Sequence, residues 1–311
     1  MSTSAQANTC HDLIDRYVTD KGIEKNLSDL TVRNYRNDLR DFARFLEKEA
    51  AGIEQVDRVV VRGYLAELAN RGMARASVIR KVSTIKGFYS YLYREGHIEQ
   101  DRLISLRSPK RQQRLPSFLA VAQIEGLLNA PERDTPQGLR DRAILELLFS
   151  SGVRVSELID IDLSDVGGGQ TEVIVRGKGD KERRVFIGRP ARAALDIYLR
   201  QGRPQLLKGQ KRAGALFLNR YGDRLSARSI QKSVRSYAVK AGIEQRAYPH
   251  LLRHSFATHM LDGGAELRVV QELLGHANVN TTQIYTHVTH QRQKEVYDQA
   301  FYAANSPRRR P

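Results

Sequence analysis

The sequence predicts a mainly α-helical protein that contains one small antiparallel β-sheet. Apolar residues recur at spacings of three and four along most of the chain, which is the period of an amphipathic helix. One glycine-containing stretch instead lies between two runs of β-branched residues, which is typical of a β-hairpin. A basic segment with two prolines separates the first helices from the rest. Because 311 residues can form two hydrophobic cores, we expect two domains.

The first domain is predicted over residues 8–97 as a bundle of four helices, the shortest of them over residues 10–20. The segment LTVRNYRNDLRDFARFLEKE is the clearest helix, with Thr31 as its N-cap. Its apolar positions share one face: Val32, Tyr35, Leu39, Phe42 and Leu46. The third helix, RVVVRGYLAELANRG, ends at Gly72, and the fourth, SVIRKVSTIKGFYSYLYREG, ends near Gly96.

Positive charge is unevenly distributed along the chain. The net charge is +16, yet residues 1–107 hold 18 basic and 15 acidic side chains, against 33 and 20 in the remainder. A basic half favours a polyanionic partner, although a solvated cationic surface is the alternative. The helical bundle also carries cations that could face DNA or simply solvent: Arg33, Arg36, Arg40, Arg44, Arg75, Arg80, Lys81 and Lys86.

Residues 98–117 are predicted to be a basic interdomain linker, because LRSPKRQQRLPSFL holds four basic residues and no acidic ones. A second domain is expected over residues 118–298, followed by a tail over 299–311. In TEVIVRGKGDKERRVFIG the β-branched runs 171–176 and 183–187 predict the hairpin. Helices are expected around it, at residues 121–130, 138–150, 189–201, 226–241, 249–262, 266–274 and 279–290.

The composition indicates a soluble intracellular protein, which we expect in the cytoplasm. No stretch approaches the roughly 18 to 20 apolar residues that a membrane span needs. The N-terminus lacks the basic start and apolar run of a secretory signal. The single cysteine, Cys10, excludes an internal disulfide and fits a reducing compartment.

The segment HLLRH places His250 and His254 four residues apart on a predicted helix that Pro249 can begin. Such a pair can bind zinc, but Leu251 stands where a zinc protease has glutamate, and no acidic or cysteine cluster is near. Arg253 would also repel a cation. An arginine one turn from a histidine is better suited to phosphate, because its planar guanidinium binds two oxygens at once. Alone, His250 would be interpreted as a core or capping histidine.

Three further stretches carry comparable residues. SSGVRVSEL places Arg154 after a glycine, at the start of a helix whose backbone N–H groups favour anions. RGKGDKERR places Lys178 at the tip of the hairpin, and LLGHANVNTTQIYTHV contains His276 and Tyr285. Taken singly, these are a structural arginine, a solvated turn lysine and a packing tyrosine.

Together these residues resemble the catalytic set of the tyrosine recombinase (phage integrase) family, particularly its Xer-type members. The family pattern is Arg, Lys, His-x-x-Arg, His or Trp, then Tyr, and it is matched in order by Arg154, Lys178, His250, Arg253, His276 and Tyr285. The resemblance covers nearly the whole chain, and Val153, where leucine is common, is a small departure. It implies an N-terminal SAM-like core-binding domain and an α+β catalytic domain that form a C-shaped clamp on DNA.

The resemblance also implies the chemistry. Tyr285 would attack a DNA phosphodiester, giving a 3′-phosphotyrosyl link and a free 5′-hydroxyl. A phenol has a pKa of about 10, so the attack needs proton removal or strong stabilisation of charge. Arg154 and Arg253 would bind the non-bridging phosphate oxygens, where negative charge grows in the transition state.

The remaining roles follow from the same resemblance. Lys178 would protonate the departing 5′-oxygen, His250 would accept the tyrosine proton, and His276 would bond the phosphate. Glu157 is a candidate to orient Arg154 or Lys178. Because the covalent intermediate conserves the bond energy, neither a metal, nor ATP, nor any other cofactor is expected.

Other candidates in the second domain are assigned to structure. Tyr297 and Tyr302 lie outside the motif and are interpreted as packing or tail residues. His254 and His259 are interpreted as packing or hydrogen-bonding within the protein.

The implied partner is double-stranded DNA with inverted-repeat half-sites, which would make the protein nucleoid-associated. The family acts as a tetramer, here either a homotetramer or a heterotetramer with a second recombinase, and a DNA translocase is a further possible activator. The segment after the tyrosine docks into a neighbouring subunit in this family, and residues 291–303 are the candidate here. No membrane partner is expected.

Three functions remain open at this stage. The first is Xer-type resolution of chromosome dimers at a dif-like site, which the absence of an added N-terminal arm-binding domain favours. The second is recombination for a phage, transposon or other mobile element. The third, of another class, is a non-catalytic architectural or regulatory DNA-binding protein. A type IB topoisomerase shares part of the chemistry and would relax plasmids that lack any target site.

Overall fold

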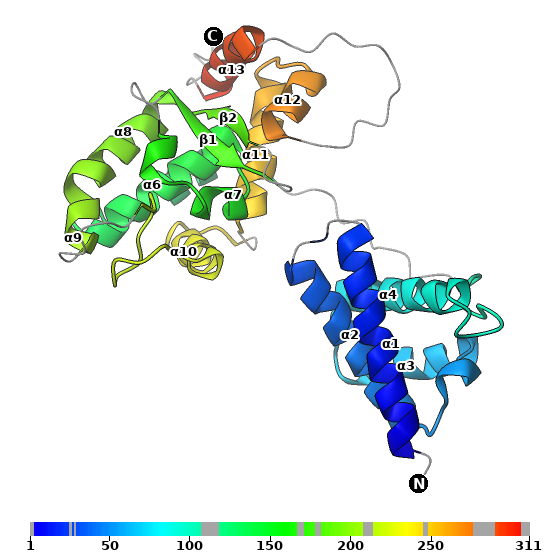
Figure 1. Cartoon of the computed structure of the whole chain (residues 1–311). Helices are drawn as coiled ribbons and strands as arrows, with labels where there is room; N and C mark the ends of the chain where they lie inside the picture. The colour runs from blue at the N-terminus through cyan, green and yellow to red at the C-terminus, as the bar shows by residue number, and fades with distance from the viewer. Residues whose placement is uncertain are drawn as a thin grey trace. The chain divides into compact units, whose positions relative to one another are not determined.

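Helices dominate both halves of the chain in the computed structural model, and a two-stranded antiparallel sheet lies in the second half (Figure 1). This confirms the predicted fold class. The structure describes residues 3–24, 27, 29–106, 118–166, 171–177, 182–207, 214–244, 248–275 and 290–305. The chain divides into two units, Met1–Leu115 and Pro116–Pro311, each with its own hydrophobic core.

Unit 1 is a bundle of four α-helices with one short 3-10 turn before the third. The helices are α1 (Thr3–Glu24), α2 (Asp29–Lys48), α3 (Arg58–Asn70) and α4 (Arg75–Arg94), and the turn is Ile53–Gln55. Helix α1 is longer than the predicted 10–20, and α2 begins at Asp29, so the assignment of Thr31 as an N-cap was wrong. A side-chain N-cap is present on α3, where Asp57 accepts from the backbone N–H groups of Val59 and Val60 over 2.7 and 3.0 Å.

Aromatic side chains form much of the core of unit 1. Phe42 of α2 meets Tyr64 of α3 edge-on, with ring centroids 5.0 Å apart. Tyr17 of α1 packs on Phe88 of α4 with centroids 5.4 Å apart. Gly87 permits this approach, because a Cβ there would lie 2.7 Å from the Tyr17 hydroxyl. The predicted apolar face of α2 is therefore the face that is buried.

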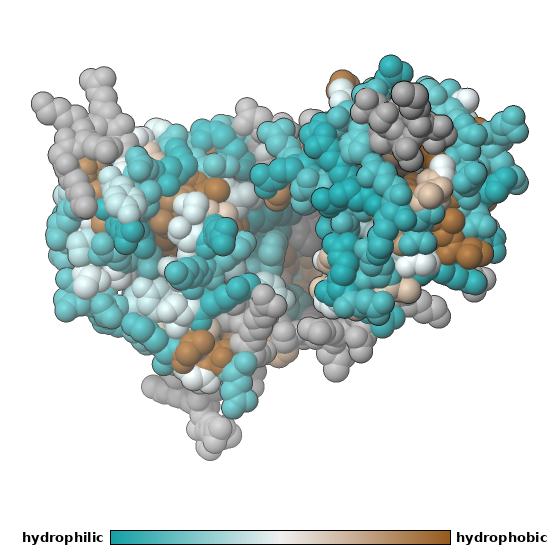
Figure 2. Space-filling model, turned by 90° about the horizontal axis from the view of Figure 1, so that it is seen from below, coloured by the Kyte–Doolittle hydropathy of each residue, from teal (hydrophilic) through white to brown (hydrophobic). Residues whose placement is uncertain are grey.

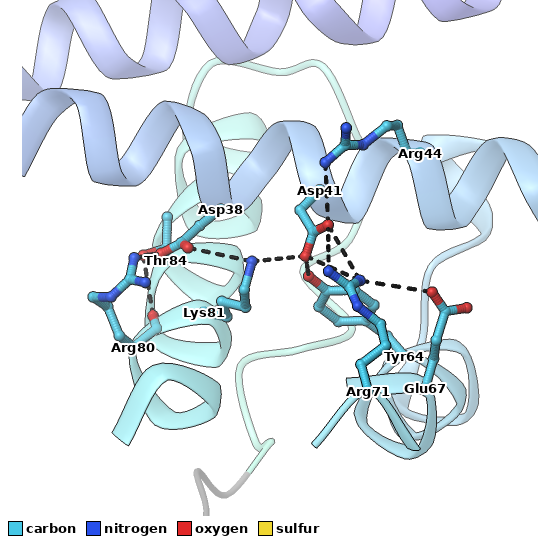
Figure 3. A network of polar contacts seen from close by, with 9 residues as sticks. All are labelled: Asp38, Asp41, Arg44, Tyr64, Glu67, Arg71, Arg80, Lys81 and Thr84. Atoms are coloured by element: carbon cyan, nitrogen blue, oxygen red, sulfur yellow. Dashed lines mark hydrogen bonds and ion pairs between the residues drawn. The ribbon is translucent and has the colours of Figure 1, made fainter. Parts of the chain in front are cut away.

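A network of charged groups lies between α2, α3 and α4 (Figure 3). Lys81 is buried and contacts two buried carboxylates, Asp41 at 2.7 Å and Asp38 at 3.4 Å. The Tyr64 hydroxyl also donates to Asp41 over 2.7 Å, and Arg71 donates over 3.3 Å. Burial opposes ionisation of Asp41, but hydrogen bonds from Lys81 and Tyr64 outweigh it and hold the pKa of that carboxyl well below its usual range.

The network changes the interpretation of the cations on this bundle. Lys81 was assigned to a polar face, yet it is buried. Arg36 and Arg40 both contact Asp15, at 2.9 and 3.2 Å. Arg75 is exposed, so it remains a candidate for DNA contact.

Unit 2 contains one hairpin and a set of helices that surround a central one, α6. The first elements are α5 (Val121–Asn129), α6 (Pro136–Ser151), α7 (Val155–Ile159), a 3-10 turn (Leu163–Asp165), β1 (Glu172–Arg176) and β2 (Glu182–Phe186). The remainder are α8 (Arg189–Ile197), a π-turn (Tyr198–Gly202), α9 (Arg203–Leu207), α10 (Ala227–Lys240), α11 (Pro249–Asp262), α12 (Leu267–Leu274) and α13 (His290–Asn305).

Helix α6 forms the centre of unit 2 and is buried over most of its length. It begins with Thr135 as N-cap and Pro136 in the first turn, and it packs on α5, α8 and α11. The helix predicted over 189–201 forms and continues to Leu207, and Tyr198–Gly202 is a π-helical turn between α8 and α9. At this turn Gly202 lies against α6, where a Cβ would come 3.1 Å from the Pro136 carbonyl oxygen.

The hairpin forms as predicted, with Glu172 paired to Phe186 and Arg176 paired to Glu182. Both strands are anchored at their ends nearest the tip. Arg176 of β1 forms two hydrogen bonds of 2.9 Å to Asp165 in the 3-10 turn. On β2, Arg183 reaches α7. The tip residues 178–181 lie outside the described residues.

Helix α13 packs against α11 of the same chain (Figure 1). Its inner face buries Val296, Tyr297, Ala300 and Phe301, and Tyr297 stacks on Phe301 with centroids 5.2 Å apart. Gly263 permits the contact, because a Cβ there would lie 2.1 Å from the Ala300 carbonyl oxygen. The packing assignment of Tyr297 is confirmed, while docking of 291–303 into a neighbouring subunit stays a prediction.

The surface drawn in Figure 2 is largely hydrophilic, with separate hydrophobic patches. The most exposed large apolar side chains come from different segments: Ile23, Ile104 and Val239. None of the helices in the described part of the chain is long and apolar enough to cross a membrane.

Candidate active site

The site is built around the junction between α6 and α7. Helix α6 ends at Gly152, which has a φ of 60°. A side chain here would be strained, and its Cβ would lie 2.6 Å from Phe256 and 2.8 Å from Leu274. Glycine therefore lets the chain turn sharply between two helices. Two residues later Arg154 becomes the N-cap of α7.

Glu157 holds Arg154 in place. The carboxylate accepts from the Arg154 backbone N–H over 2.9 Å and from Nη1 over 2.7 Å. The Glu157 side chain is 3% exposed and that of Arg154 is 38% exposed, so the acid lies beneath the arginine. The contact with Glu157 uses Nη1 of Arg154, and the arginine side chain remains partly exposed. The contact between Glu157 and Arg154 that the sequence suggested is thus present.

Arg253 comes from α11 and joins the ends of two other helices. Its Nη1 donates to the Gly152 carbonyl after α6, and its Nη2 donates over 2.7 Å to the Leu274 carbonyl of α12. Burial, together with the nearby charge of Arg154, lowers the pKa of Arg253 to about 10, although Glu157 acts in the opposite direction. The guanidinium therefore remains charged at neutral pH, in a place where water solvates it poorly.

Arg183 is a member of this cluster that the sequence analysis missed. Its Nη2 donates to Glu157 over 2.8 Å and its Nη1 donates to the Leu273 carbonyl over 3.3 Å. Strand alternation could have indicated it, because Arg183 pairs with Val175 and lies two residues from Val185, and both valines are buried. An arginine on the inner face of a strand needs an acidic or carbonyl partner.

His250 lies at the start of α11, after Tyr248 as N-cap and Pro249 in the first turn. It is exposed, whereas Arg253 one turn later is buried. His254 is exposed as well, so it does not pack in the core, and a hydrogen bond within the protein stays a prediction for it. His259 is buried and its Nε2 lies 3.1 Å from the Leu119 carbonyl oxygen, as an internal role requires.

Three predicted site residues, Lys178, His276 and Tyr285, lie outside the described residues. The described segments next to Lys178 and His276 do lie at the site. Lys178 falls between β1 and β2, and His276 directly follows Gly275, the left-handed C-cap of α12. The last two carbonyl groups of α12 accept from Arg183 and Arg253.

The described side chains of the cluster are three arginines and one carboxylate. Their partial burial makes the excess positive charge costly until an anion arrives. Arginine forks that face a partly water-excluded site are suited to phosphate and to the charge of a phosphoryl transition state. Among the described residues, no group of three or more His, Cys, Asp or Glu side chains could hold a metal ion.

Comparison with known proteins agrees with this geometry. A family model described as the phage integrase family matches residues 117–292, and one described as the phage integrase N-terminal SAM-like domain matches residues 14–96. Tyrosine recombinase XerC of Pelotomaculum thermopropionicum is 43% identical over 293 residues, covering 91% of this chain and 96% of that protein. Tyrosine recombinase XerD of Listeria innocua is 39% identical over 291 residues, covering 93% and 98%.

A solved structure shares the fold. The XerH site-specific recombinase bound to a palindromic difH substrate, in a post-cleavage complex, superposes with a TM-score of 0.73. It is 22% identical and covers 93% of this chain and 95% of its own. Fold, arginine cluster and sequence relatives together define an enzyme that breaks and rejoins DNA. The chain belongs to the phage integrase family, among the tyrosine recombinases.

Proposed function

We propose that the protein is a Xer-type site-specific recombinase that exchanges DNA strands through a 3′-phosphotyrosyl intermediate. The observation that carries the proposal is the placement of Arg154 and Arg253 around Gly152, with Glu157 beneath Arg154. Two positively charged forks at one point match the two non-bridging oxygens of a phosphodiester. Relatives that carry the names XerC and XerD support the same function.

In the proposed reaction the phenolic oxygen of Tyr285 attacks the phosphorus and displaces the 5′-oxygen of the next nucleotide. The tyrosine proton passes to His250, and Lys178 gives a proton to the leaving oxygen, so that a 5′-hydroxyl is released. Arg154 and Arg253, with His276, stabilise the charge on the non-bridging oxygens. A 5′-hydroxyl from the partner duplex then attacks the phosphotyrosyl bond and regenerates Tyr285.

The proposed partner is duplex DNA carrying two inverted half-sites, which we expect both unit 1 and unit 2 to contact. Exposed cations of unit 1 such as Arg75 are suited to backbone phosphates. Four protomers would act on two duplexes, either as a homotetramer or with a second recombinase, and a translocase is a candidate activator. The biological role we propose is resolution of chromosome dimers in the cytoplasm, at a dif-like site on the nucleoid.

Covalent capture tests the proposal. The protein is expressed in its host, cells are denatured without protease, and DNA still attached to the protein is recovered and sequenced. Wild type and Tyr285→Phe are compared, and Tyr302→Phe controls for a second tyrosine near the C-terminus. Adducts at one inverted-repeat locus that vanish only in Tyr285→Phe are expected.

Other outcomes separate the alternatives. A capture site within a mobile element would assign the same chemistry to an element integrase. Scattered adducts and relaxation of plasmids without a site would indicate a type IB topoisomerase. Binding at one site with no adduct in the wild type, even on a nicked substrate that traps the intermediate, would favour a non-catalytic DNA-binding protein.

A further inference from the structure

Arg183 of β2 contacts residues of two other elements at the site. Its side chain is 20% exposed, with Glu157 at 2.8 Å and the Leu273 carbonyl at 3.3 Å. It also lies against Gly275, where a Cβ would come 2.6 Å from Nε of Arg183. Strand β2, helix α7 and the end of α12 therefore meet at this one guanidinium.

Glu157 divides its carboxylate between two arginines. Oε1 accepts from Arg154 Nη1 over 2.7 Å, and Oε2 accepts from Arg183 Nη2 over 2.8 Å. A shift of the start of β2, where Arg183 lies, would therefore displace Glu157, the carboxylate that holds Arg154. This carboxylate is nearly fully buried, so the hydrogen bonds are worth more than those of an exposed pair.

The hairpin has a second anchor that does not reach this cluster. Arg176 of β1 binds Asp165 through two hydrogen bonds of 2.9 Å, and it also contacts Glu182 at 3.1 Å. Asp165 belongs to the 3-10 turn, where its carboxylate accepts from the Asp162 backbone N–H. Of these two anchors, the one through Arg183 links the hairpin to Arg154.

We propose that Arg183 is a positioning residue, which sets the place of the hairpin that carries Lys178 relative to the phosphate-binding Arg154. This inference rests on the proposed function, because it assumes that Lys178 protonates the leaving oxygen. Arg183 acts through Glu157 and does not contact the reacting phosphate. Its Nη atoms donate to Glu157 and to the Leu273 carbonyl, and Nε faces Gly275, so these contacts fix the start of β2 against α7 and α12.

The chemistry of the leaving group provides a direct test. A duplex carrying the captured site is made with sulfur in place of the 5′-bridging oxygen at the scissile phosphate. A thiol has a pKa of about 8.5, so the thiolate leaves without a proton from the enzyme. A variant that has lost only the placement of Lys178 should then cleave the sulfur duplex at a rate close to that of wild type. A variant that has lost phosphate binding should stay slow on both duplexes.

The variants are chosen in matched pairs. Arg183→Met removes the anchor and keeps an unbranched side chain. Arg184→Met is its control, because the neighbouring Arg184 is 65% exposed and its contact with Glu172, at 3.8 Å, does not involve the site. Lys178→Ala is the reference for a variant that lacks the leaving-group proton, and Arg154→Ala is the reference for a variant that has lost phosphate binding. Arg183→Lys keeps the charge with one nitrogen, so it can satisfy Glu157 or Leu273 but not both in the arginine geometry.

Single-turnover cleavage should fall about 100-fold in Arg183→Met on the oxygen duplex, since a displacement of about 1 Å can cost that much. On the sulfur duplex its rate should return to within about fivefold of wild type, as for Lys178→Ala. Arg183→Lys should show a smaller loss on oxygen with the same recovery, and Arg184→Met should match wild type. DNA affinity and melting temperature are measured for each variant.

Two results would overturn the inference. Arg183→Met that cleaves the oxygen duplex like wild type would show that the anchor is dispensable. An equal loss on both duplexes, in the pattern of Arg154→Ala, would assign Arg183 to phosphate binding. Should Arg183→Met fail to fold, Arg183→Lys decides by the same comparison. If the proposed function itself were wrong, the wild-type protein would show no cleavage that depends on Tyr285, so this outcome is distinguishable from failure of the inference.

Discussion

The guanidinium of Arg253 donates a hydrogen bond of 2.7 Å to the carbonyl oxygen of Leu274, the last residue of α12. Its other Nη donates to Gly152, directly after α6. The carbonyl groups at a helix C-terminus lack helical partners and carry the negative end of the helix dipole, so they favour a cation. One buried arginine thus fixes the ends of two helices, and the helices in turn fix the arginine at the proposed phosphate site.

Arg253→Lys should therefore slow DNA cleavage although it keeps the charge. A single ammonium cannot bridge Gly152 and Leu274 in the arginine geometry, and it offers no planar fork to phosphate. We expect a loss of about 100-fold or more in the single-turnover rate, in the range for removal of a preorganised donor. Arg200→Lys, at a side chain that is 76% exposed, is the control and should leave the rate unchanged. An unaffected Arg253→Lys would contradict this assignment.

Inorganic phosphate should stabilise the free protein more than chloride does at the same ionic strength. The cluster of Arg154, Arg183 and Arg253 exceeds Glu157 in charge, and an anion would relieve the repulsion that helps to lower the pKa of Arg253. At a concentration of about ten times Kd the gain is about 1.4 kcal/mol. The measurement is the unfolding temperature in each salt. Arg154→Ala should remove most of the difference, and a difference that persists would locate the bound anion elsewhere.

Much of this arrangement could be predicted from local pattern. The stepping of Leu39, Phe42 and Leu46 predicted α2, because helix period and burial coincide there. The hairpin followed from its β-branched runs. The π-helical turn after α8 could not be predicted, because nothing in the local sequence shows that Gly202 approaches the Pro136 carbonyl of α6.

In the site, too, some residues could be predicted from the local sequence and others depend on contacts between distant segments. Arg154 and Arg253 could be predicted, because their motifs name them. Arg183 was missed, since its importance comes from sharing Glu157 of α7 with Arg154, although Arg183 itself lies in β2. Spacing along the chain does not contain that relationship.

Asp41→Asn should destabilise unit 1 strongly. It leaves Asp38 as the charged partner of buried Lys81, and it leaves one amide oxygen to accept from both Lys81 and Tyr64, which now donate to the carboxylate. Breaking a buried ion pair by removing one partner costs about 3–5 kcal/mol. Asp15→Asn is the matched control, because its pairs with Arg36 and Arg40 are half-exposed and should be worth about 1 kcal/mol or less. Denaturant unfolding of the whole chain measures both.

The same network predicts a pH dependence of stability. The pKa of Asp41 is lowered by folding, so unfolded chains bind the proton more readily than folded ones. The stabilisation is therefore complete above the ordinary aspartate pKa of about 4 and is lost as pH falls below it. The difference in unfolding free energy between wild type and Asp41→Asn should shrink steadily below about pH 4. A constant difference would show that ionisation of Asp41 is not what stabilises the network.

Removal of residues 291–311 should impair recombination, and the packing of α13 adds that it should also destabilise unit 2. Tyr297 and Phe301 are buried against the core, and the Tyr297 hydroxyl donates to the Ser150 carbonyl over 2.9 Å. Phe301→Ala alone should cost about 3–5 kcal/mol in unfolding free energy. The matched control is Gln299→Ala, at an exposed position on the same helix.

A change confined to the exposed side of α13 separates docking from stability. Lys294 and Asp298 are exposed, so Lys294→Glu with Asp298→Lys should leave the unfolding temperature nearly unchanged. If 291–303 docks into a neighbouring subunit, this double variant should bind one site normally and lose assembly of paired sites, measured by gel shift and by strand exchange. Normal exchange in the double variant, together with low stability in Phe301→Ala, would mean that α13 serves its own subunit. The recombination defect of the truncated chain would then follow from loss of the core contact made by Tyr297 and Phe301.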